Sequence, residues 1–349
     1  MFNINKPIAE GFCFPLYSPG VNCMQKIAFM IGDPAGIGPE ITVRCINEYK
    51  NRGPVSLILV GDRPSFDRAL KVCDVKMNIQ DITEDQIKNS EADLMFLNIP
   101  VENGEMIPYG EVSAKSGACV YRSLKKIMSL IDSKLIQGFV FAPFNKEAMK
   151  KGGCPFPSEL DMFKDHFNRP DITGEINFLD PMWTVRVSSH IAVKDIPLYV
   201  KKERILDSIT FLNEELKRFS VKRRRIAVAA LNPHGGEKGL FGTEEGDEIE
   251  PAVKAAREAG IDASGPFPAD TIFLKVKNGE YDAIVSMYHD QGQIATKLLG
   301  FDKGVTIHGG MPVAIATCAH GTAFDIAGKG VAKPTALIQA LKVVLGSLK

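Results

Sequence analysis

Three histidines in separate polar surroundings are the side chains whose type and placement best suit chemistry. The chain has six histidines, and His190, His234 and His289 each stand at or just beyond the end of a strand-like apolar run. In a parallel α/β sheet, the strand ends and the loops after them line the crevice in which ligands bind. Three imidazoles that converge there would make an open divalent-metal site, with positions left for a substrate. Three unrelated surface or capping histidines are the alternative.

A lysine follows the third histidine on the same predicted helix. The string His-Asp-Gln-Gly-Gln-Ile-Ala-Thr-Lys runs from His289 to Lys297, which separates the two side chains by about two helical turns. A ligand histidine and a lysine over one pocket suit a metal-bound substrate that carries a carboxylate or an ionising hydroxyl. This string therefore predicts a substrate-binding helix.

Two glycine-rich segments are candidate ligand loops. Gly32–Glu40 follows the first predicted strand and opens a helix, whose N-terminus offers N–H groups to an anion. It is not a G-x-G-x-x-G motif, and a structural tight turn explains it equally well. The segment 320–334 has glycines at 321, 328 and 330 and an aspartate at 325. It resembles the adenosine-binding loop of isopropylmalate and isocitrate dehydrogenases, which implies NAD or NADP; a glycine-rich turn with a capping histidine is the alternative.

Two further segments leave both interpretations open. Ser113 is well placed as a helix N-cap, and Lys115 is either an anion contact or, preferably, a solvated surface lysine. The segment 142–161, with Asn145 and Lys146 followed by two carboxylates, is either a cleft wall or a set of exposed acids at a helix start.

Short apolar runs alternate with amphipathic stretches, which predicts βαβ units and a mostly parallel sheet. The predicted strands cover 26–31, 56–61, 94–98, 137–142, 184–189, 226–231, 282–287 and 313–317. The predicted helices cover 38–50, 64–72, 113–132, 145–152, 159–167, 203–218, 247–259, 269–277, 291–299 and 334–347. The polar stretch 165–180 is predicted to be a loop, with His166 at the surface.

Bulk properties restrict the class of protein. Lys plus Arg equals Asp plus Glu, so no net charge points to nucleic acid or to an anionic membrane. No apolar run reaches the length of a membrane span. The seven cysteines are scattered without a C-x-x-C pair, which predicts reduced thiols and a cytoplasmic protein. Residues 1–23 lack periodicity, and we expect a disordered or mis-started leader, with the functional chain beginning near Met24.

Five motifs together resemble the 4-hydroxythreonine-4-phosphate dehydrogenase (PdxA) family. They run in the family's order from about residue 24 to the C-terminus: 32–40, 232–237, 265–271, 288–292 and 320–325. The resemblance implies an α/β fold of the isocitrate/isopropylmalate dehydrogenase type, with two α/β/α lobes and a central cleft. It also implies a homodimer that oxidises a secondary alcohol with NAD and a divalent metal, followed by decarboxylation.

The resemblance also assigns residues. It places the metal on His190, His234 and His289, the substrate on Lys297, and NAD or NADP on His320, Gly321, Thr322 and Asp325. The predicted catalytic residues are Lys297, which would bind the carboxylate or relay a proton, and Asp270, which would contact the substrate or support a ligand histidine from behind. The metal would be Zn, Mg, Co or Mn. We expect a cofactor-side lobe of 24–135 with 292–349, and a metal and dimerisation lobe of 136–291.

The chain departs from the family at four substrate positions. Glu159 and Leu160 replace a His-Thr pair, Thr306 replaces an asparagine, and Ile315 replaces an arginine. These changes remove charge-assisted donors that would hold a phosphate, and Glu159 would repel one. The terephthalate dihydrodiol dehydrogenases are a related branch that similarly lacks those groups.

The resulting hypothesis is an NAD- and metal-dependent dehydrogenase, decarboxylating, that acts on an unphosphorylated hydroxy acid or diol. Genuine 4-hydroxythreonine-4-phosphate dehydrogenase activity and a non-catalytic ligand sensor are the alternatives. Isopropylmalate- or isocitrate-type activity would need metal-binding aspartates and an arginine cluster, which we do not find. A metal-dependent hydrolase would leave the loop after His320 unexplained.

Overall fold

The computed structural model describes residues 24–50, 53–169, 174–300 and 302–348. The predicted leader, residues 1–23, lies outside the described residues. None of the described helices has the length and apolarity needed to cross a bilayer.

One mixed sheet of 12 strands runs through the described part of the chain, in the order β3-β4-β2-β1-β5-β12-β11-β6-β7-β10-β8-β9. This confirms the predicted α/β class. The strands are β1 (Gln25–Met30), β2 (Val55–Gly61), β3 (Gln80–Asp81), β4 (Leu94–Asn98), β5 (Gly138–Phe141), β6 (Gly174–Leu179), β7 (Met182–Arg186), β8 (Ile226–Ala229), β9 (Ala263–Phe267), β10 (Ala283–Ser286), β11 (Val305–Gly309) and β12 (Ala314–Cys318).

The sheet consists of two parallel halves joined by antiparallel strands. β1, β2, β4, β5 and β12 are paired in parallel on one side, and β7, β8, β9 and β10 on the other. Between them, β11 pairs antiparallel with both β12 and β6, and β6 pairs antiparallel with β7. β5 lies between β1 and β12 in this order. The boundaries predicted for the two lobes stay a prediction.

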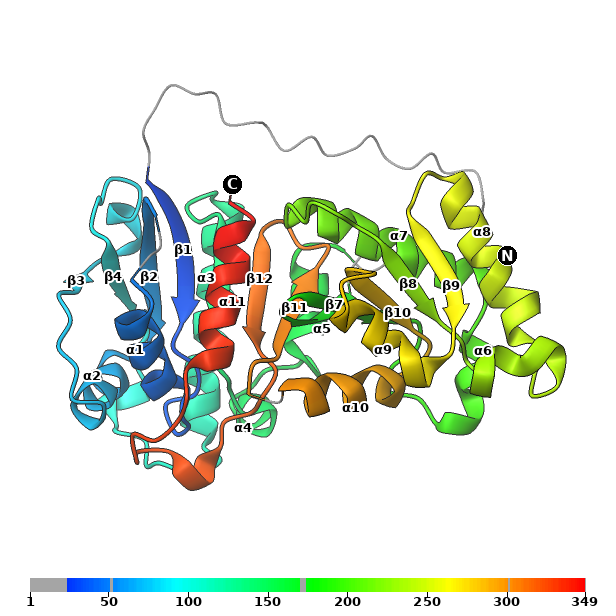
Figure 1. Ribbon diagram of the computed structural model, residues 1–349. Coiled ribbons are helices and arrows are strands. Elements are labelled where there is room, and N and C mark those ends of the chain that lie inside the picture. Colours follow the sequence, from blue (N-terminus) through cyan, green and yellow to red (C-terminus); the bar gives the residue numbers. More distant parts are fainter. Residues whose placement is uncertain (1–23, 51–52, 170–173, 301, 349) are drawn as a thin grey trace.

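Helices cover both faces of the sheet, as Figure 1 shows for the half that contains β1. They are α1 (Gly38–Glu48), α2 (Arg63–Val72), α3 (Ala114–Asp132), α4 (Lys146–Lys151), α5 (Glu159–His166), α6 (Ile196–Tyr199), α7 (Lys202–Arg218), α8 (Glu250–Glu258), α9 (Ala269–Lys277), α10 (His289–Gly300) and α11 (Thr335–Gly346).

Alternate residues of β1 belong to two different hydrophobic clusters. Ile27 and Phe29 pack in the cluster that contains α1 and α11, whereas Ala28 and Met30 pack in the cluster that contains α3. Because both faces of the strand are buried, its sequence is a continuous apolar run rather than an alternating one. That is the pattern from which these strands were predicted.

The predicted loop over 165–180 is wrong at its end, because residues 174–179 form β6. Ile176 and Phe178 are buried while Glu175 and Asn177 are half-buried. This short alternation is typical of a strand with one polar face. Residues 170–173 of the same stretch lie outside the described residues.

Candidate active site

His190 and His289 lie side by side because their strands are neighbours. β7 and β10 pair in parallel, and the chain beyond them stays joined: Ser188 N donates to the carbonyl oxygen of Met287 at 3.1 Å, and Ser188 Oγ donates to the same oxygen at 2.8 Å. The two imidazole ring centres are 5.5 Å apart. At this separation two ring nitrogens can face a common ion, since zinc–nitrogen bonds are about 2.0–2.1 Å long.

His289 is also oriented by its own helix start. Its Nδ1 lies 2.7 Å from Asp290 Oδ1, an arrangement that leaves Nε2 for a ligand. Two residues on, Gln291 accepts from Met287 N at 2.7 Å and donates to the carbonyl oxygen of Ala230 at 2.8 Å. The Gln291 side chain therefore ties the start of α10 to the ends of both β10 and β8.

His234 stands on a separate loop with unusual backbone geometry. Residues 234–238 all have positive φ values. The buried carboxylate of Glu245 anchors the chain before the loop, because its Oε1 accepts from Leu231 N at 2.9 Å and from Asn232 N at 2.8 Å. The His234 side chain is 67% exposed, and its Nδ1 lies 3.0 Å from Glu237 Oε1.

The described residues do not form a complete metal site. No group of three His, Cys, Asp or Glu side chains among them is arranged to hold an ion. The structure brings together His190 and His289 but not the whole predicted trio. The metal set of three histidines therefore stays a prediction.

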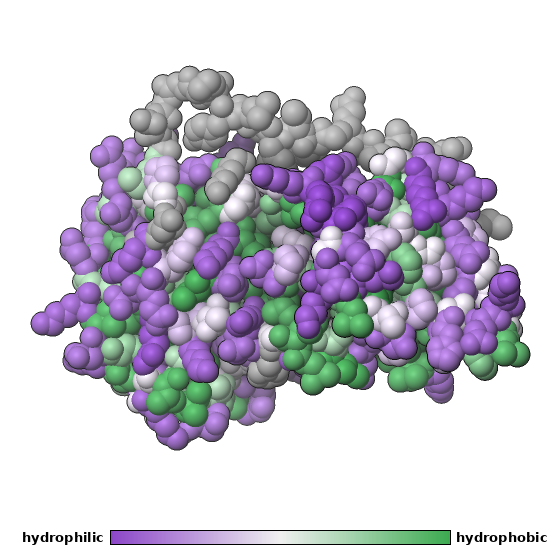
Figure 2. Space-filling view, in the orientation of Figure 1, coloured by the Kyte–Doolittle hydropathy of each residue, from purple (hydrophilic) through white to green (hydrophobic). Residues whose placement is uncertain are grey.

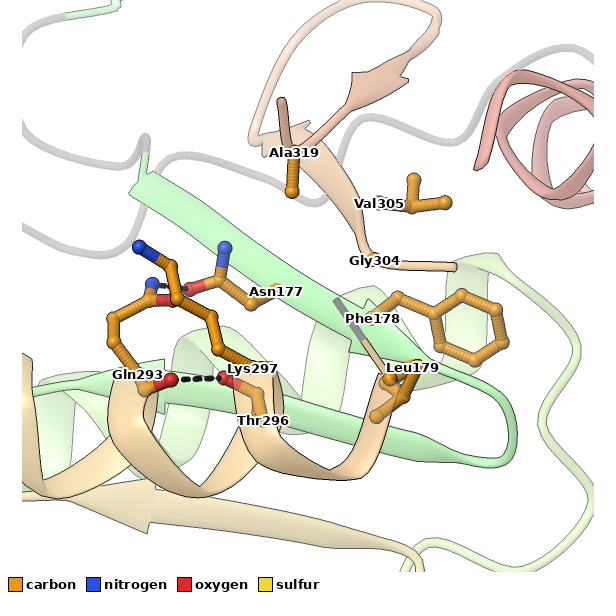
Figure 3. A pocket seen from close by; sticks show the side chains of 10 residues that line it. Asn177, Phe178, Leu179, Gln293, Thr296, Lys297, Gly304, Val305 and Ala319 are labelled. Atoms are coloured by element: carbon orange, nitrogen blue, oxygen red, sulfur yellow. Dashed lines mark hydrogen bonds between the residues drawn. The ribbon is translucent and has the colours of Figure 1, made fainter. Parts of the chain in front are cut away.

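Lys297 lines a small pocket between the two halves of the sheet. In Figure 3 its side chain extends beside those of Gln293 and Asn177, above an apolar side made by Phe178 and Leu179. The remaining lining residues are Thr296, Gly300, Gly304, Val305 and Ala319. Asp270, the other predicted catalytic residue, is exposed in the first turn of α9.

Two of the four altered substrate positions are buried, and the other two are half-buried. Ile315 is fully buried in β12, and Glu159 is buried at the start of α5. Leu160 packs against the same hydrophobic cluster as Ile315, while Thr306 is half-buried in β11. In this arrangement Glu159 and Ile315 offer little surface to a ligand.

Glu159 belongs to a buried charged group. Its Oε2 lies 3.0 Å from Lys146 Nζ, and its Oε1 lies 4.0 Å from His308 Nε2. Burial opposes ionisation of the carboxyl, but the His308 imidazole and the Lys146 ammonium outweigh it and hold the pKa of Glu159 below its usual range. Burial lowers the pKa of His308, and the nearby carboxylates of Glu159 and Glu175 oppose this shift.

The predicted cofactor loop packs against the first glycine-rich loop. Ile37 N donates to the carbonyl oxygen of Thr322 at 3.0 Å, and a Cβ on Gly36 would lie only 3.0 Å from Thr322 Cβ. Thr322 is buried by this contact, whereas Gly321 and Asp325 are exposed and His320 is half-buried. His320, Gly321 and Asp325 are thus the predicted cofactor residues that a ligand can reach.

The buried carboxylate of Glu40 holds the far end of this loop. Its Oε1 accepts from Gly328 N, and its Oε2 accepts from Gly330 N at 3.0 Å. Both glycines have positive φ values, 80° and 64°. This role of Glu40 is not among the predictions from the sequence, although the residue belongs to the first glycine-rich motif and lies in the first turn of α1.

Asp33 joins three motifs that the sequence left separate. Its buried carboxylate accepts from Ala35 N at 2.9 Å, from Asn145 N at 3.3 Å and from Ser116 Oγ. Burial raises the pKa of Asp33. These bonds favour the interpretation of Asp33 as the residue that fixes the turn.

Comparison with known proteins gives the class and then the family. The family described as "Pyridoxal phosphate biosynthetic protein PdxA" matches residues 54–344. A D-threonate 4-phosphate dehydrogenase of Pectobacterium atrosepticum is 37% identical over 330 residues, which cover 92% of this chain and 99% of that protein. The crystal structure of a 4-hydroxythreonine-4-phosphate dehydrogenase from Klebsiella pneumoniae has a TM-score of 0.80 and 32% identity, over 93% of this chain and 100% of that one.

Two more distant structures support the fold alone. A terephthalate 1,2-cis-dihydrodiol dehydrogenase from Burkholderia xenovorans LB400 has a TM-score of 0.65 at 23% identity, covering 92% of this chain and 98% of that one. A β-decarboxylating dehydrogenase from Thermococcus kodakarensis has a TM-score of 0.51 at 16% identity, covering 93% and 84%. The predicted fold of the isocitrate/isopropylmalate dehydrogenase type is confirmed.

The fold and these relatives define the class: an α/β oxidoreductase that acts on a hydroxyl group. Within that class, the chain belongs to the PdxA family.

Proposed function

We propose that this chain oxidises a hydroxyl of an unphosphorylated hydroxy acid, or of a diol that carries a carboxylate, with NAD or NADP as the hydride acceptor, and that the resulting β-keto acid then loses carbon dioxide. The observation that carries the proposal is the pocket between α10 and the cofactor loop. Lys297 lines one side of it, and Ala319, the residue directly before His320, lines another. A substrate held by Lys297 would therefore lie next to the loop that binds the cofactor.

The residues of this chain would divide the work between substrate and cofactor. The Lys297 ammonium would bind the substrate carboxylate, and it can hold a proton near the reacting carbon. His320, Gly321 and Asp325 would hold the adenosine end, on a loop whose backbone is fixed by Glu40 and by the contact with Gly36. The cofactor supplies the hydride chemistry, and the protein supplies binding and orientation.

The absence of phosphate-binding groups supports the unphosphorylated substrate. Glu159 is ionised and paired with Lys146, so the ammonium nearest to it is already neutralised. Ile315 is an apolar core residue. Phosphate is held in proteins by several charge-assisted donors, and these positions supply none. The alternative, a phosphorylated substrate, is favoured by two of the relatives, which are named as dehydrogenases of D-threonate 4-phosphate and of 4-hydroxythreonine-4-phosphate.

We also propose that His190, His234 and His289 bind one divalent ion, which would act as a Lewis acid on the substrate hydroxyl. The adjacent rings of His190 and His289 support it. So do the carboxylates beside Nδ1 of His234 and His289, because ligand histidines usually bond to a carboxylate through their second nitrogen.

Replacement of His234 tests the metal proposal. We expect His234→Ala to lose stoichiometric metal, measured by elemental analysis of purified protein, and to lose turnover with it. His166→Ala is the matched control, because His166 is bound to Asp132 on another surface. Full metal content in His234→Ala would refute the assignment of this ligand.

A homodimer in the cytoplasm completes the proposal. Large apolar side chains are exposed on α10, among them Ile294 at 60% and Leu298 at 83%. Others lie close to the predicted metal loops, at Leu198, Leu240 and Phe241. Figure 2 shows hydrophobic surface gathered along the edge that α10 forms. An apolar surface of this kind is typical of a subunit interface.

A further inference from the structure

A buried arginine organises the polar side of the Lys297 pocket. The side chain of Arg186 is 9% exposed, and it donates to Glu175 Oε2 at 2.6 Å, to Asn177 Oδ1 at 2.6 Å and to Ser189 Oγ at 2.9 Å. Ser189 directly precedes His190. A single guanidinium thus connects the pocket wall to the predicted metal loop.

This arginine decides which way the Asn177 amide faces. A guanidinium only donates hydrogen bonds, so Asn177 must present its carbonyl oxygen to Arg186. The same oxygen lies 2.7 Å from Gln293 Nε2, which therefore donates as well. Because Oδ1 of Asn177 accepts from both donors, the amino group is the remaining polar group of this side chain. Asn177 lines the pocket, so its amino group can donate to a ligand there.

The three polar side chains of the pocket then offer a defined set of partners. Asn177 provides a neutral N–H donor and Lys297 provides a charged donor. Gln293 donates through Nε2, which leaves its Oε1 as an acceptor. In Figure 3 these three side chains lie together at one side of the pocket. Two donors and one acceptor match a carboxylate with a hydroxyl on the next carbon.

The strand register explains why Asn177 stands where a substrate contact is needed. β11 and β6 pair with Thr306 directly opposite Asn177. Position 306 is the one at which the family resemblance implies a substrate asparagine and this chain has threonine. This chain therefore has a side-chain amide at this level of the sheet, but Asn177 of β6 carries it and not position 306 of β11.

We propose that Asn177 is a substrate-binding residue of this chain, which donates to the carboxylate held by Lys297, and that Arg186 is the residue that positions it. Gln293 accepts from the neighbouring hydroxyl. The pocket thus selects a 2-hydroxy carboxylate by a neutral amide and one ammonium. The inference rests on the proposed function for the identity of the pocket, and it names the part of the substrate that the pocket binds.

Binding of a hydroxy acid and of its carboxylate-free analogue tests this directly. Calorimetric titration of the full chain with D-threonate and with D-threitol compares two four-carbon probes that differ at one terminal carbon. The variant is Asn177→Asp, which keeps Oδ1 as the acceptor for Arg186 and Gln293 but replaces the amino donor by a second oxygen and a negative charge. Asn89→Asp, at an exposed position outside the pocket, is the matched control.

We expect the wild-type chain to prefer D-threonate, and Asn177→Asp to bind it at least about tenfold more weakly. Its affinity for D-threitol should change much less, and its melting temperature should stay close to that of the control. Unchanged D-threonate affinity in Asn177→Asp, or a wild-type chain without preference for D-threonate, would overturn the inference. Binding as expected without any reduction of NAD would instead refute the proposed function and leave this binding site in place.

Discussion

At the scale of single residues, buried carboxylates do most of the positioning around the candidate site. Glu40 fixes the predicted cofactor loop, Glu245 fixes the chain before His234, and Asp33 fixes the first glycine-rich turn. In each case the carboxylate accepts from backbone N–H groups, which are costly to leave unpaired when buried. Glu159 differs from them because its partners are side chains, Lys146 and His308.

The lowered pKa of Glu159 makes its contribution to stability depend on pH. A carboxyl with a lower pKa in the folded state stabilises the fold above its unfolded pKa of about 4.3, and this contribution is lost as pH falls through the folded value. We expect the free energy of unfolding of Glu159→Gln to be about 1–2 kcal/mol lower than that of the wild-type chain at pH 7. Below pH 4 this difference should shrink. Urea unfolding at both pH values measures it.

Glu147→Gln is the control for that experiment, because Glu147 pairs with Lys151 on an exposed surface. Exposed ion pairs contribute little to stability. If Glu159→Gln and Glu147→Gln lose the same free energy of unfolding at pH 7, the buried group around Glu159 has no special role.

At the scale of elements, α1 and the loop before α11 depend on each other. Glu40 lies in the first turn of α1, and its bonds reach residues about 290 positions later in the chain. The sequence predicts that each segment follows a strand, but it does not predict that the two segments are in contact. That contact depends on β1 and β12 lying on either side of β5.

Replacement of Glu40 tests this dependence. Glu40→Gln keeps one acceptor oxygen but places its amino group against the other of the two N–H groups, that of Gly328 or of Gly330, so the loop should lose order. We expect NAD to raise the melting temperature of the wild-type chain by several degrees at saturation and to raise that of Glu40→Gln much less. Glu48→Gln, at an exposed position of the same helix, should behave like wild type. An equal NAD-induced rise in Glu40→Gln would contradict the positioning role.

Strand prediction succeeded where the sequence contains a continuous apolar run and failed where it does not. β1, β2, β4 and β10 are continuous apolar runs and were found. β11 contains Thr306 and His308, and β9 contains glycine and proline, so neither shows such a run. β6 was missed because its alternating pattern follows a polar stretch.

Apart from the four-residue α6, which was missed, the helices were found with small errors at their ends, because amphipathic periodicity and N-cap residues mark them. Ser113, Asn145 and Ser158 each cap a helix as side-chain acceptors.

The candidate site was only partly predictable from the sequence. His190 and His289 meet because β7 and β10 are neighbours, but the Arg186–Asn177 pair depends on β6, which the sequence did not reveal.

At the scale of the whole molecule, two parallel half-sheets meet at β11 and β6, and the pocket lies at this junction. α10 would link the predicted metal site to the pocket, since it begins at His289 and carries Lys297 two turns later. Its other face exposes Ile294 and Leu298. The same helix would thus serve metal, substrate and subunit interface.

The proposed interface predicts the mass of the particle in solution. Light scattering after gel filtration should give twice the 38.2 kDa of one chain. Leu298→Lys together with Leu240→Lys should shift the mass toward one chain, because both side chains are among the most exposed apolar groups. Lys254→Glu, at an exposed position of α8, is a control for charge change. A wild-type mass of one chain would contradict the dimer.

The most direct measurement of the central claim is the kcat/KM for NAD reduction with a hydroxy acid and with its phosphate ester, in the presence of a divalent metal. D-threonate and D-threonate 4-phosphate form one such pair, and 4-hydroxythreonine and its 4-phosphate form another. The structure predicts at least about a tenfold preference for the unphosphorylated member of a pair, because the phosphate would lack charge-assisted donors. An equal or higher kcat/KM for the phosphorylated member would contradict the account.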